Sequence, residues 1–457
     1  MSPTPDVFPG WRLEHRYESL PDLPVLAEVD VLVVGGGAAG VAAATTAAEA
    51  GMQTLIVERY GFFGGAAVAG MSGTLCGMYM ASDTRSDPEQ VVTGFTERFR
   101  AALEVRGGVT GPQRYGKTWT VTHDPLMWRE VADQLVEAAG ARVLFHTSVS
   151  GVIMRGDACI GVVLESAAGQ SIVLARCVID ASGDAAVVAR AGLGYVFGDQ
   201  GKIQNPTMFF RLGQVDMARF LDYWGEDTIN PPKVSEAITL ADEQHRYALP
   251  RKKIWIFPTT RPGELLVNAT RLTSRDGHMM NVINPADITE AEIDGRKQVR
   301  EYAAFLSACV PGCEASYVVD TGTQVGVRQT RSIVGVATLS NEDVLQCRKR
   351  PDGICRVPWP IELHAGEKPK LHWLLDDYYE VPYLALVPEH GENLIVAGRC
   401  LSAEHEALAS ARVTAQCFEY GRAAALAAVL SLQTTRRLRD IPGEEIRAAM
   451  RQLGSSL

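Results

Sequence analysis

The stretch that decides the fold is DVLVVGGGAAG, residues 30–40. Its apolar run at 31–34 predicts a buried parallel strand. The glycines at 35, 37 and 40 form a Gly-x-Gly-x-x-Gly turn, and the Ala-rich segment 41–50 that follows predicts a helix ended by Gly51. A second buried strand is expected at 54–58. Strand, turn, helix and strand in this order within about 30 residues predict a βαβ unit.

Each glycine of the turn has a separate physical use. Gly35 permits the tight turn, Gly37 lets the backbone approach a pyrophosphate, and Gly40 lets the helix pack closely on the strand. The free N–H groups and positive dipole end of the helix, at Ala38 and Ala39, would face the phosphates. Glu58 ends the second strand 23 residues after Gly35, which suits a hydrogen bond to a ribose 2′-OH. These features together predict a dinucleotide-binding unit.

The chain then stays rich in glycine, with Arg59-Tyr-Gly-Phe-Phe-Gly64-Gly65-Ala66. A dehydrogenase of the NAD type would normally continue directly into another helix and strand. Bare backbone beside the first domain suits a longer cofactor that lies along it. No second Gly-x-Gly-x-x-Gly follows a strand elsewhere, so no separate NAD(P)H domain is expected.

The rest of the chain predicts mixed helices and strands. A helix should start at Asp124-Pro125 and stop at Gly140. Strands at 142–147, 149–155, 159–165 and 171–179 are expected to form a β-meander that leads into Asp180-Ala-Ser-Gly-Asp184. Thr289 with Glu292 predicts a capping box. A strand at 393–397 and a long helix from about Ser410 to Leu432 should close the fold.

Composition narrows the function classes. The net charge of −10 disfavours a nucleic-acid partner. None of the nine cysteines forms a C-x-x-C pair, so no metal site is expected. The first 22 residues have no apolar core and do not resemble a signal peptide. Val31 to Ala48 carries no charge, but its glycines favour strand, turn and helix over a membrane span. We expect a cytoplasmic protein without membrane contact.

Several blocks together resemble the FAD-dependent oxidoreductases of the glutathione-reductase/fumarate-reductase type, and most closely the subfamily with a Gly-Phe-x-Gly-Gly stretch. The blocks cover nearly the whole chain. They are Val31–Gly65, Asp180–Asp184, Asn205–Arg211, Val267–Arg271, Gly326–Gly335, Val381–Tyr383, Asn393–Cys400 and Arg412-Val413. Two departures, Gln329-Thr330 and the Gly421-Arg-Ala-Ala-Ala425 segment of the last helix, concern the substrate site more than the fold.

The resemblance implies an α/β fold. A Rossmann-type FAD-binding domain, with a doubly wound sheet plus β-meander, would carry an inserted α+β substrate domain. The expected ranges are 1–27 for an N-terminal extension, 28–80, 120–200 and 385–440 for the discontinuous FAD domain, 81–119 for an insert, 200–384 for the substrate or cap domain and 441–457 for a C-terminal tail.

The resemblance also implies noncovalent FAD and assigns residues to it. Glu58 should hold the adenosine ribose, Val149 the adenine through its backbone, and Arg412 and Val413 should face the flavin. The full set expected to bind the cofactor is Gly35, Gly37, Ala38, Ala39, Gly40, Glu58, Arg59, Gly64, Gly65, Ala66, Val149, Ala181, Gly183, Asp184, Gly398, Arg399, Arg412 and Val413.

For catalysis the sequence offers four candidates. Arg328 and Arg331 suit bidentate capture of a carboxylate. His405 follows the strand before Gly398 and could accept a proton as hydride leaves the same carbon, and His364 follows a block similar to the family. Structural roles remain open for all four.

The function expected is hydride transfer between the flavin and a small polar metabolite that carries a carboxylate. A flavin monooxygenase and a flavoprotein subunit that relays electrons to a redox partner protein are the alternatives. A homo-oligomer is left open.

Overall fold

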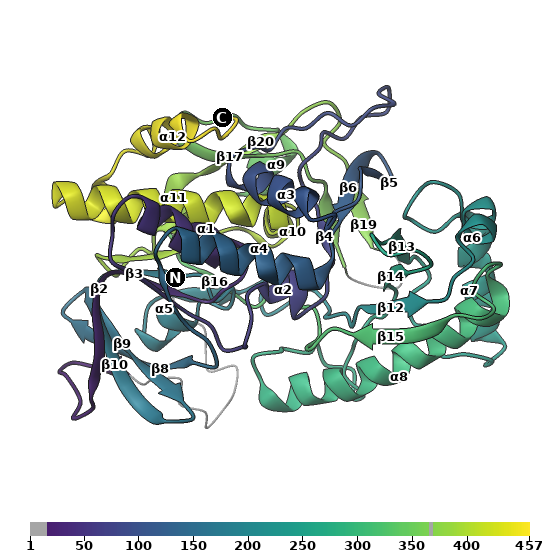
Figure 1. Ribbon diagram of the computed structural model, residues 1–457, viewed down its shortest axis with the longest axis horizontal. Coiled ribbons are helices and arrows are strands. Elements are labelled where there is room, and N and C mark those ends of the chain that lie inside the picture. The colour runs from purple at the N-terminus through teal and green to yellow at the C-terminus, as the bar shows by residue number, and fades with distance from the viewer. Residues whose placement is uncertain (1–15, 365–368) are drawn as a thin grey trace.

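The computed structural model describes residues 16–364 and 369–457, so most of the expected N-terminal extension, residues 1–15, lies outside the described part. The chain builds a nucleotide domain on one large sheet, and a second group of strands and helices packs beside it (Figure 1). The architecture is mixed α/β with a Rossmann-type parallel sheet, which confirms the predicted fold class.

The predicted βαβ unit is present. It consists of β2 (Val25–Val34), α1 (Ala38–Glu49) and β3 (Thr54–Val57). The parallel layer continues on both sides, through β7 (Arg142–Leu144) next to β3 and through β10 (Gly169–Asp180) next to β2. β21 (Leu394–Val396) pairs in parallel with the end of β10, as the closing strand expected at 393–397. The layer therefore brings strands from distant parts of the sequence to one edge.

The two faces of β2 pack against different layers. Val31 and Val33 belong to the core cluster that contains α1, whereas Leu32 and Val34 face the meander side. The meander consists of β8 (Ser148–Arg155), β9 (Ala158–Ser166) and the first half of β10, all antiparallel. β1 (Arg16–Tyr17) extends it beside β8, and α5 (Ala186–Arg190) packs below. The strand expected at 142–147 is not part of the meander, since it forms β7 at the far edge.

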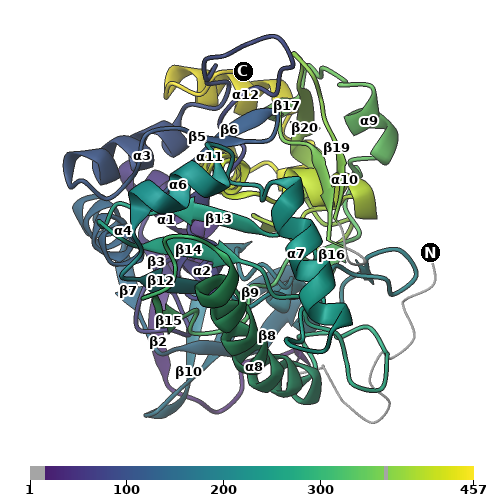
Figure 2. The ribbon, with the colours of Figure 1, turned by 90° about the vertical axis from the view of Figure 1, so that its right-hand side faces the viewer.

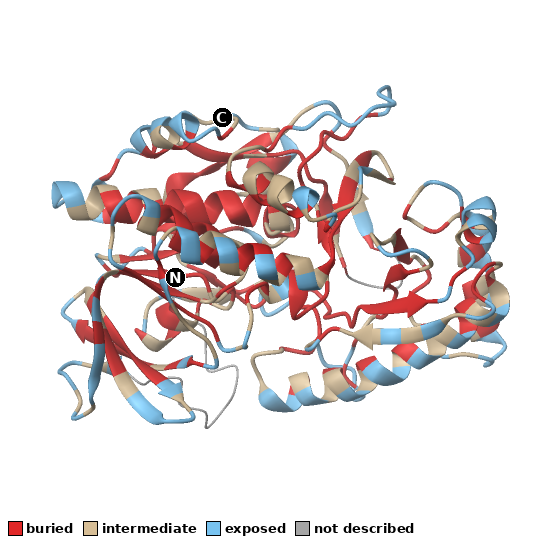
Figure 3. Ribbon diagram, viewed as in Figure 1, coloured by how far each residue is buried: buried red, intermediate tan, exposed pale blue. Residues whose placement is uncertain are grey.

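Helix α1 is enclosed between the sheet and α11 (Thr414–Thr434), and both helices are buried along most of their length (Figure 3). A Cβ at Gly421 of α11 would lie 1.9 Å from the carbonyl oxygen of Ala39, so the two helix backbones touch. Helices α3 (Phe95–Val105) and α4 (Pro125–Ala138) cover this pair, and the rings of Phe99, Trp128 and Phe418 contact one another in tilted pairs.

The long helix expected from Ser410 to Leu432 is two helices. α10 (His405–Ala411) ends before Arg412, and α11 starts at Thr414. Val413 between them is extended, with φ −78° and ψ 164°, which breaks the helical hydrogen bonds. The Arg412 side chain turns instead to Gln204 of another segment, and this tertiary contact leaves no mark in an alanine-rich sequence.

The inserted domain has its own sheet and core. Four antiparallel strands run in the order β13-β14-β12-β15, and α8 lies along their outer side (Figure 2). A separate hydrophobic core gathers apolar residues from Met208 to Val325. Its elements are β12 (Phe210–Gly213), α6 (Met217–Trp224), α7 (Pro232–Glu243), β13 (Trp255–Pro258), β14 (Leu265–Asn268), α8 (Pro285–Cys309) and β15 (Tyr317–Thr321).

Helix α8 begins five residues earlier than the capping box predicted, since its N-cap is Asn284 and not Thr289 (289 − 284 = 5). Asn284 caps it by accepting a hydrogen bond from the backbone N–H of Ala286. Thr289 lies inside the helix and donates to the carbonyl of Pro285, while Glu292 accepts from the backbone N–H of Val325. The predicted box is wrong because Pro285 at the first helical position and an Asn cap already start the helix.

The residues that make up the two hydrophobic cores suggest a shorter inserted domain than the range 200–384 expected from the sequence. Leu339, Ile354 and Tyr379 pack into the first core, together with Ile446 near the C-terminus. We therefore propose that the insert ends near 325 and that the remainder, including 441–457, belongs to the nucleotide domain. The elements after 325 are β16 (Arg331–Ile333), α9 (Asn341–Leu345), β17 (Gly353–Val357), β18 (Ile361–Leu363), β19 (Lys370–His372), β20 (Tyr379–Pro382), η1 (Tyr383–Leu386), η2 (Leu438–Asp440) and α12 (Gly443–Gln452).

The segment expected as an insert at 81–119 also joins the first core, through α3 and a three-stranded sheet. The remaining elements are α2 (Gly65–Val68), β4 (Thr74–Leu75), β5 (Gln113–Tyr115), β6 (Thr118–Thr122) and β11 (Tyr195–Phe197).

Within 16–364 and 369–457, no helix combines the length and the apolar character that crossing a bilayer requires.

The contact between α1 and α11 predicts that one added methyl group strongly lowers the stability of the fold. Gly421→Ala places a Cβ against the Ala39 carbonyl, and overpacking of this kind costs about 1–3 kcal/mol. Urea denaturation should show a lower midpoint. Gly111→Ala is the matched control, because a Cβ there meets nothing within 4 Å and should change stability by less than about 0.5 kcal/mol. Equal stability of the two variants would contradict the close helix contact.

Candidate functional site

A large cavity opens where the carboxyl ends of β2, β10 and β21 meet the inserted domain. It encloses about 1410 Å³ of space, counting the part open to solvent. Phe209, Phe257 and Asn268 line it from the inserted domain, opposite the Gly35–Gly40 turn. Open parallel sheets bind ligands at this edge.

The N-terminus of α1 forms one end of the cavity. Gly37 is its N-cap and no side chain caps the helix, so its first N–H groups remain available to a ligand. A Cβ at Gly37 would meet only the Cα of Gly65, at 3.9 Å. A Cβ at Gly40 would lie 1.8 Å from the carbonyl oxygen of Gly35. Gly37 therefore keeps space free on the cavity side, whereas Gly40 serves packing within the turn.

Glu58 lies beside this end and is held by backbone donors. Its Oε2 accepts from the N–H of Gly36 at 2.6 Å, and its Oε1 accepts from the N–H of Tyr60 at 2.9 Å. The side chain is 5% exposed and lines the cavity. A carboxylate has about four acceptor positions, so capacity remains for a ribose hydroxyl.

A turn after β10 forms the next part of the wall. Gly183 has φ +75°, and a Cβ there would lie 2.6 Å from Nη1 of Arg399. Asp184 stands behind this turn and accepts from Arg399 at 2.6 Å and from Thr330 at 2.7 Å. Burial opposes ionisation of Asp184, yet the Arg399 charge and the Thr330 hydroxyl hold its pKa below its usual value. The carboxylate thus fixes Arg399 at the cavity edge.

Most residues predicted to bind the cofactor line this cavity. They are Gly35, Gly37, Ala38, Ala39, Glu58, Arg59, Gly64, Gly65, Ala66, Ala181, Gly183, Gly398, Arg399, Arg412 and Val413. Three others do not line it. Gly40 and Asp184 support the wall from behind, and Val149 is buried in β8.

Of the four catalytic candidates, Arg328 and His364 line the cavity and two do not. Arg331 donates to the carbonyl of Asp184, and its guanidinium lies over the ring of Tyr195 at 5.1 Å. His405 is the first residue of α10, and burial lowers the pKa of its imidazole. Arg331 and His405 therefore do not join Arg328 and His364 at the cavity wall, and the closeness of His405 to Gly398 in the sequence does not fix the direction of its side chain.

The inner end of the cavity holds a chain of polar contacts. The Tyr115 hydroxyl donates to Oε1 of Glu362 at 2.7 Å, and Nε2 of His364 lies 3.1 Å from the same oxygen. On its other side, Nδ1 of His364 lies 3.4 Å from Nη2 of Arg251. All four side chains are buried. The contacts join three segments far apart in the sequence.

The protonation of this chain follows from burial and charge. Burial and the nearby Arg328 cation lower the pKa of His364 well below its usual value, so the imidazole is neutral at pH 7. Its one N–H then goes to Glu362, and Nδ1 accepts from Arg251. Burial opposes ionisation of Glu362, but the bonds from His364 and Tyr115 and the Arg412 charge keep its pKa low. Glu362 is therefore an anion.

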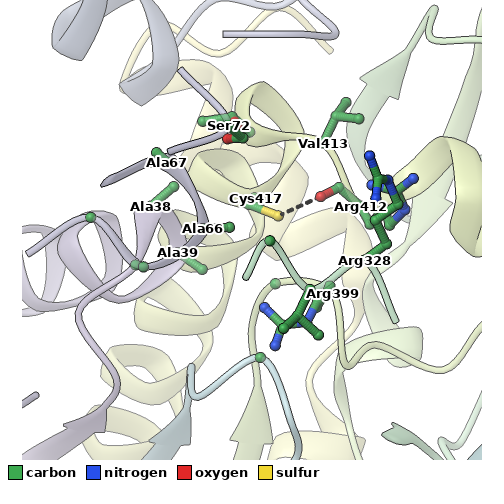
Figure 4. Close-up of a pocket in the computed structure, with 18 of the residues that line it drawn as sticks. Ala38, Ala39, Ala66, Ala67, Ser72, Arg328, Arg399, Arg412, Val413 and Cys417 are labelled. Carbon is green, nitrogen blue, oxygen red and sulfur yellow. Dashed lines mark hydrogen bonds between the residues drawn. The ribbon is translucent and has the colours of Figure 1, made fainter. Parts of the chain in front are cut away.

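Two guanidinium groups near this anion, those of Arg328 and Arg412, line the cavity, and a third, that of Arg251, lies behind His364. All three have neutral acceptors as partners. Arg251 donates to Oδ1 of Asn268, Arg328 to the carbonyl of Asn205, and Arg412 to Oε1 of Gln204. Within the described residues none of the three has a carboxylate within 4 Å. Figure 4 shows Arg328 and Arg412 together on one side of the pocket, opposite Ala38 and Ala39. The inner end is a positively charged chamber.

The sequence did not reveal Tyr115, Glu362 or Arg251 as site residues. Tyr115 lies in the stretch expected to be an insert, and Arg251 in a segment without a recognisable motif. Glu362 lies two residues before His364, in the block that resembles the family. A buried acid within a strand was the one available signal, since charged residues are rarely buried without a role.

Comparison with known proteins identifies the family. A family model described as FAD dependent oxidoreductase matches residues 30–450. The chain belongs to this family. It is an FAD-dependent oxidoreductase, and FAD is its cofactor.

Two solved structures are similar to this chain, and the one with a TM-score above 0.5 supports the fold alone. The p-nitrophenol 4-monooxygenase of Pseudomonas putida DLL-E4 superposes with a TM-score of 0.51 at 11% identity, covering 93% of this chain and 86% of its own. A geranylgeranyl bacteriochlorophyll reductase-like protein of Thermoplasma acidophilum gives a TM-score of 0.49 at 15% identity, covering 93% and 84%. A search of curated proteins finds no match.

The cavity of this FAD-dependent oxidoreductase fits the cofactor on structural grounds. The uncapped α1 terminus offers N–H groups to a pyrophosphate, and Gly37 leaves the space beside them free. Glu58 stands one strand away with acceptor capacity for a ribose.

Gly37→Val tests this fit. Gly37 has φ −72° and ψ −173°, which valine adopts readily, and its Cβ meets no close protein atom. The variant should fold but purify without flavin, as measured by absorbance near 450 nm and by circular dichroism. Gly40→Ala should instead lower the melting temperature, because its Cβ would strike Gly35. A folded Gly37→Val protein with full flavin content would contradict the assignment.

Proposed function

We propose that this FAD-dependent oxidoreductase transfers hydride between the flavin and a small polar metabolite that carries a carboxylate. The observation that supports this is the inner chamber lined by Arg328 and Arg412, with Arg251 behind His364, all three with neutral hydrogen-bond partners. Three buried cations face the single anion Glu362, and buried charge that is not fully compensated is costly, so the site favours an anionic ligand. A carboxylate can accept paired hydrogen bonds from a guanidinium.

We further propose how the cavity divides between cofactor and metabolite. Glu58 would bind the adenosine ribose and the α1 terminus the pyrophosphate, while Arg399 would lie along the ribityl chain. Val413 and Thr414 line the cavity at the start of α11, a helix without a side-chain cap. Its free N–H groups would stabilise negative charge on the reduced ring. FAD, when bound, supplies the two-electron acceptor or donor.

Within the family we propose the glutathione-reductase/fumarate-reductase type, because Gly61-Phe-Phe-Gly64-Gly65 matches its Gly-Phe-x-Gly-Gly stretch. Gly64 and Gly65 both line the cavity, and Gly64 precedes α2. The oxygen-activating alternative and the electron-relay alternative predict different products, so kinetics can separate them.

Anaerobic bleaching of the holoenzyme tests the proposed function. A library of small carboxylic acids and their matched primary amides is mixed with the yellow protein without oxygen. We expect flavin bleaching by some acids and by none of the amides. Bleaching by amides or amines instead would contradict a carboxylate substrate. Oxygen uptake with a hydroxylated product would favour a monooxygenase, and reduction by a ferredoxin alone would favour a relay subunit.

Arg328→Met should separate acid binding from cofactor binding. Loss of one guanidinium from a buried carboxylate site costs about 2–5 kcal/mol, so the Michaelis constant for the acid should rise strongly while FAD content is kept. Arg190→Met is the control, since Arg190 donates to the carbonyl of Ala186 and does not line the cavity. An unchanged Michaelis constant in Arg328→Met would contradict the role of this arginine.

A further inference from the structure

We infer that the metabolite is a hydroxy acid, oxidised to the oxo acid, and that Glu362 accepts the proton of its hydroxyl group. This inference rests on the proposed function, because it assumes that the arginine chamber holds a carboxylate. It adds the chemical group that is oxidised and the residue that takes the proton.

Glu362 is the carboxylate at the inner end of the cavity, where we propose that the metabolite binds. Among the described residues that line the cavity, the acids are Glu58 and Glu362. Both oxygens of Glu58 accept backbone N–H groups at the nucleotide end. In Glu362, by contrast, Oε1 accepts the hydroxyl of Tyr115 and contacts Nε2 of His364. No partner of Oε2 is found in the described part of the chain. One oxygen of Glu362 is therefore left for a ligand.

The neighbours of Glu362 cannot take the proton in its place. Both nitrogens of His364 are used, one toward Glu362 and one toward Arg251. Burial and the Glu362 charge raise the pKa of Tyr115 well above its usual value, so its hydroxyl stays protonated and acts as a donor. His364 and Tyr115 thus orient the carboxylate, and they are positioning residues.

The charge around Glu362 selects a hydroxyl group over an amine. The chamber holds three guanidiniums and one carboxylate, so a protonated amine would meet net repulsion in a buried site. A neutral hydroxyl avoids this repulsion and can donate directly to Oε2. His364 separates Arg251 from Glu362 by a single imidazole ring. Because Arg251 and Glu362 are this close together, they suit a ligand whose hydroxyl and carboxylate groups are close together.

The oxidation balances with these groups. The C–H bond of the hydroxyl-bearing carbon breaks, and its electron pair leaves as hydride to FAD. The O–H bond breaks, and its electron pair forms the second C–O bond of the oxo acid. The proton moves to the Glu362 carboxylate. The oxidant is the cofactor of the family, so no further reactant is needed.

The substrate class is tested with matched pairs on the FAD-loaded enzyme under anaerobic conditions. Lactate, malate and mandelate are compared with alanine, aspartate and phenylglycine, which differ by hydroxyl against ammonium. We expect at least one hydroxy acid to bleach the flavin at least 100-fold faster than its amino partner. Faster bleaching by an amino acid, or none by any hydroxy acid, overturns the inference. Bleaching by compounds without a carboxylate would instead overturn the proposed function itself.

Glu362→Gln tests the proton acceptor with the hydroxy acid that bleaches best. The amide keeps the shape and accepts from Tyr115, but it cannot take a proton. General-base catalysis contributes about 10²–10⁴-fold, so the rate constant of flavin reduction should fall at least 100-fold with a dissociation constant within a few-fold. Glu264→Gln, a buried acid paired with Arg211 outside the cavity, is the control and should keep the rate. An unchanged rate in Glu362→Gln overturns the role.

A chemical rescue separates a catalytic role from a structural one. Added formate should restore flavin reduction in Glu362→Ala, because it supplies a small carboxylate to the vacated space. If Glu362→Gln does not hold FAD, Glu362→Asp decides the question. A slower rate with an unchanged dissociation constant supports the inference, and an unchanged rate overturns it.

Discussion

The structure depends on the close backbone packing of helix α1. Gly40 allows the helix to touch the turn that starts it, and Gly421 allows α11 to touch it from the other side. A helix held this closely on both sides has a fixed direction, so its uncapped N-terminus points into the cavity without any side chain to orient it. The alanines of α1 serve the same purpose, because larger side chains would push α11 away. The direction of the α1 N-terminus, and with it the place offered to the cofactor, is thus a consequence of helix packing.

The inner chamber depends on the contact between the two cores. Arg251 and Arg328 come from the inserted segment and the stretch just after it, whereas Glu362 and Arg412 come from segments packed on the first core. Each group alone would place charge in a solvent-exposed cleft, where water screens it. When the cores meet, burial strengthens every interaction between these charges and lowers the pKa of Arg251 to about 10. The selectivity for an anion that we propose would therefore arise at the junction.

Short sequence patterns predicted those elements that depend on interactions between residues close together in the chain. The β2–α1–β3 unit, the place of Glu58 at the end of β3 and the strands of the meander follow from hydrophobic runs and glycine spacing. The α10–α11 break could not be predicted in the same way. An alanine-rich segment favours a continuous helix, and the hydrogen bond from Arg412 to Gln204 that accompanies the break joins residues 208 apart in the sequence. The same holds for His405, whose direction is set by the start of α10.

The sequence by itself determined the nucleotide-binding unit, because tight turns and buried strands need particular residue types within a short stretch. Only the tertiary structure decided which polar side chains share the inner chamber. Tyr115, Arg251 and Glu362 are more than 100 residues apart in sequence from one to the next, and no local propensity relates them. Their meeting follows from how the β5–β6 hairpin, the inserted domain and β18 pack together. Long-range packing, which a single sequence does not display, therefore fixed the chemistry of the site.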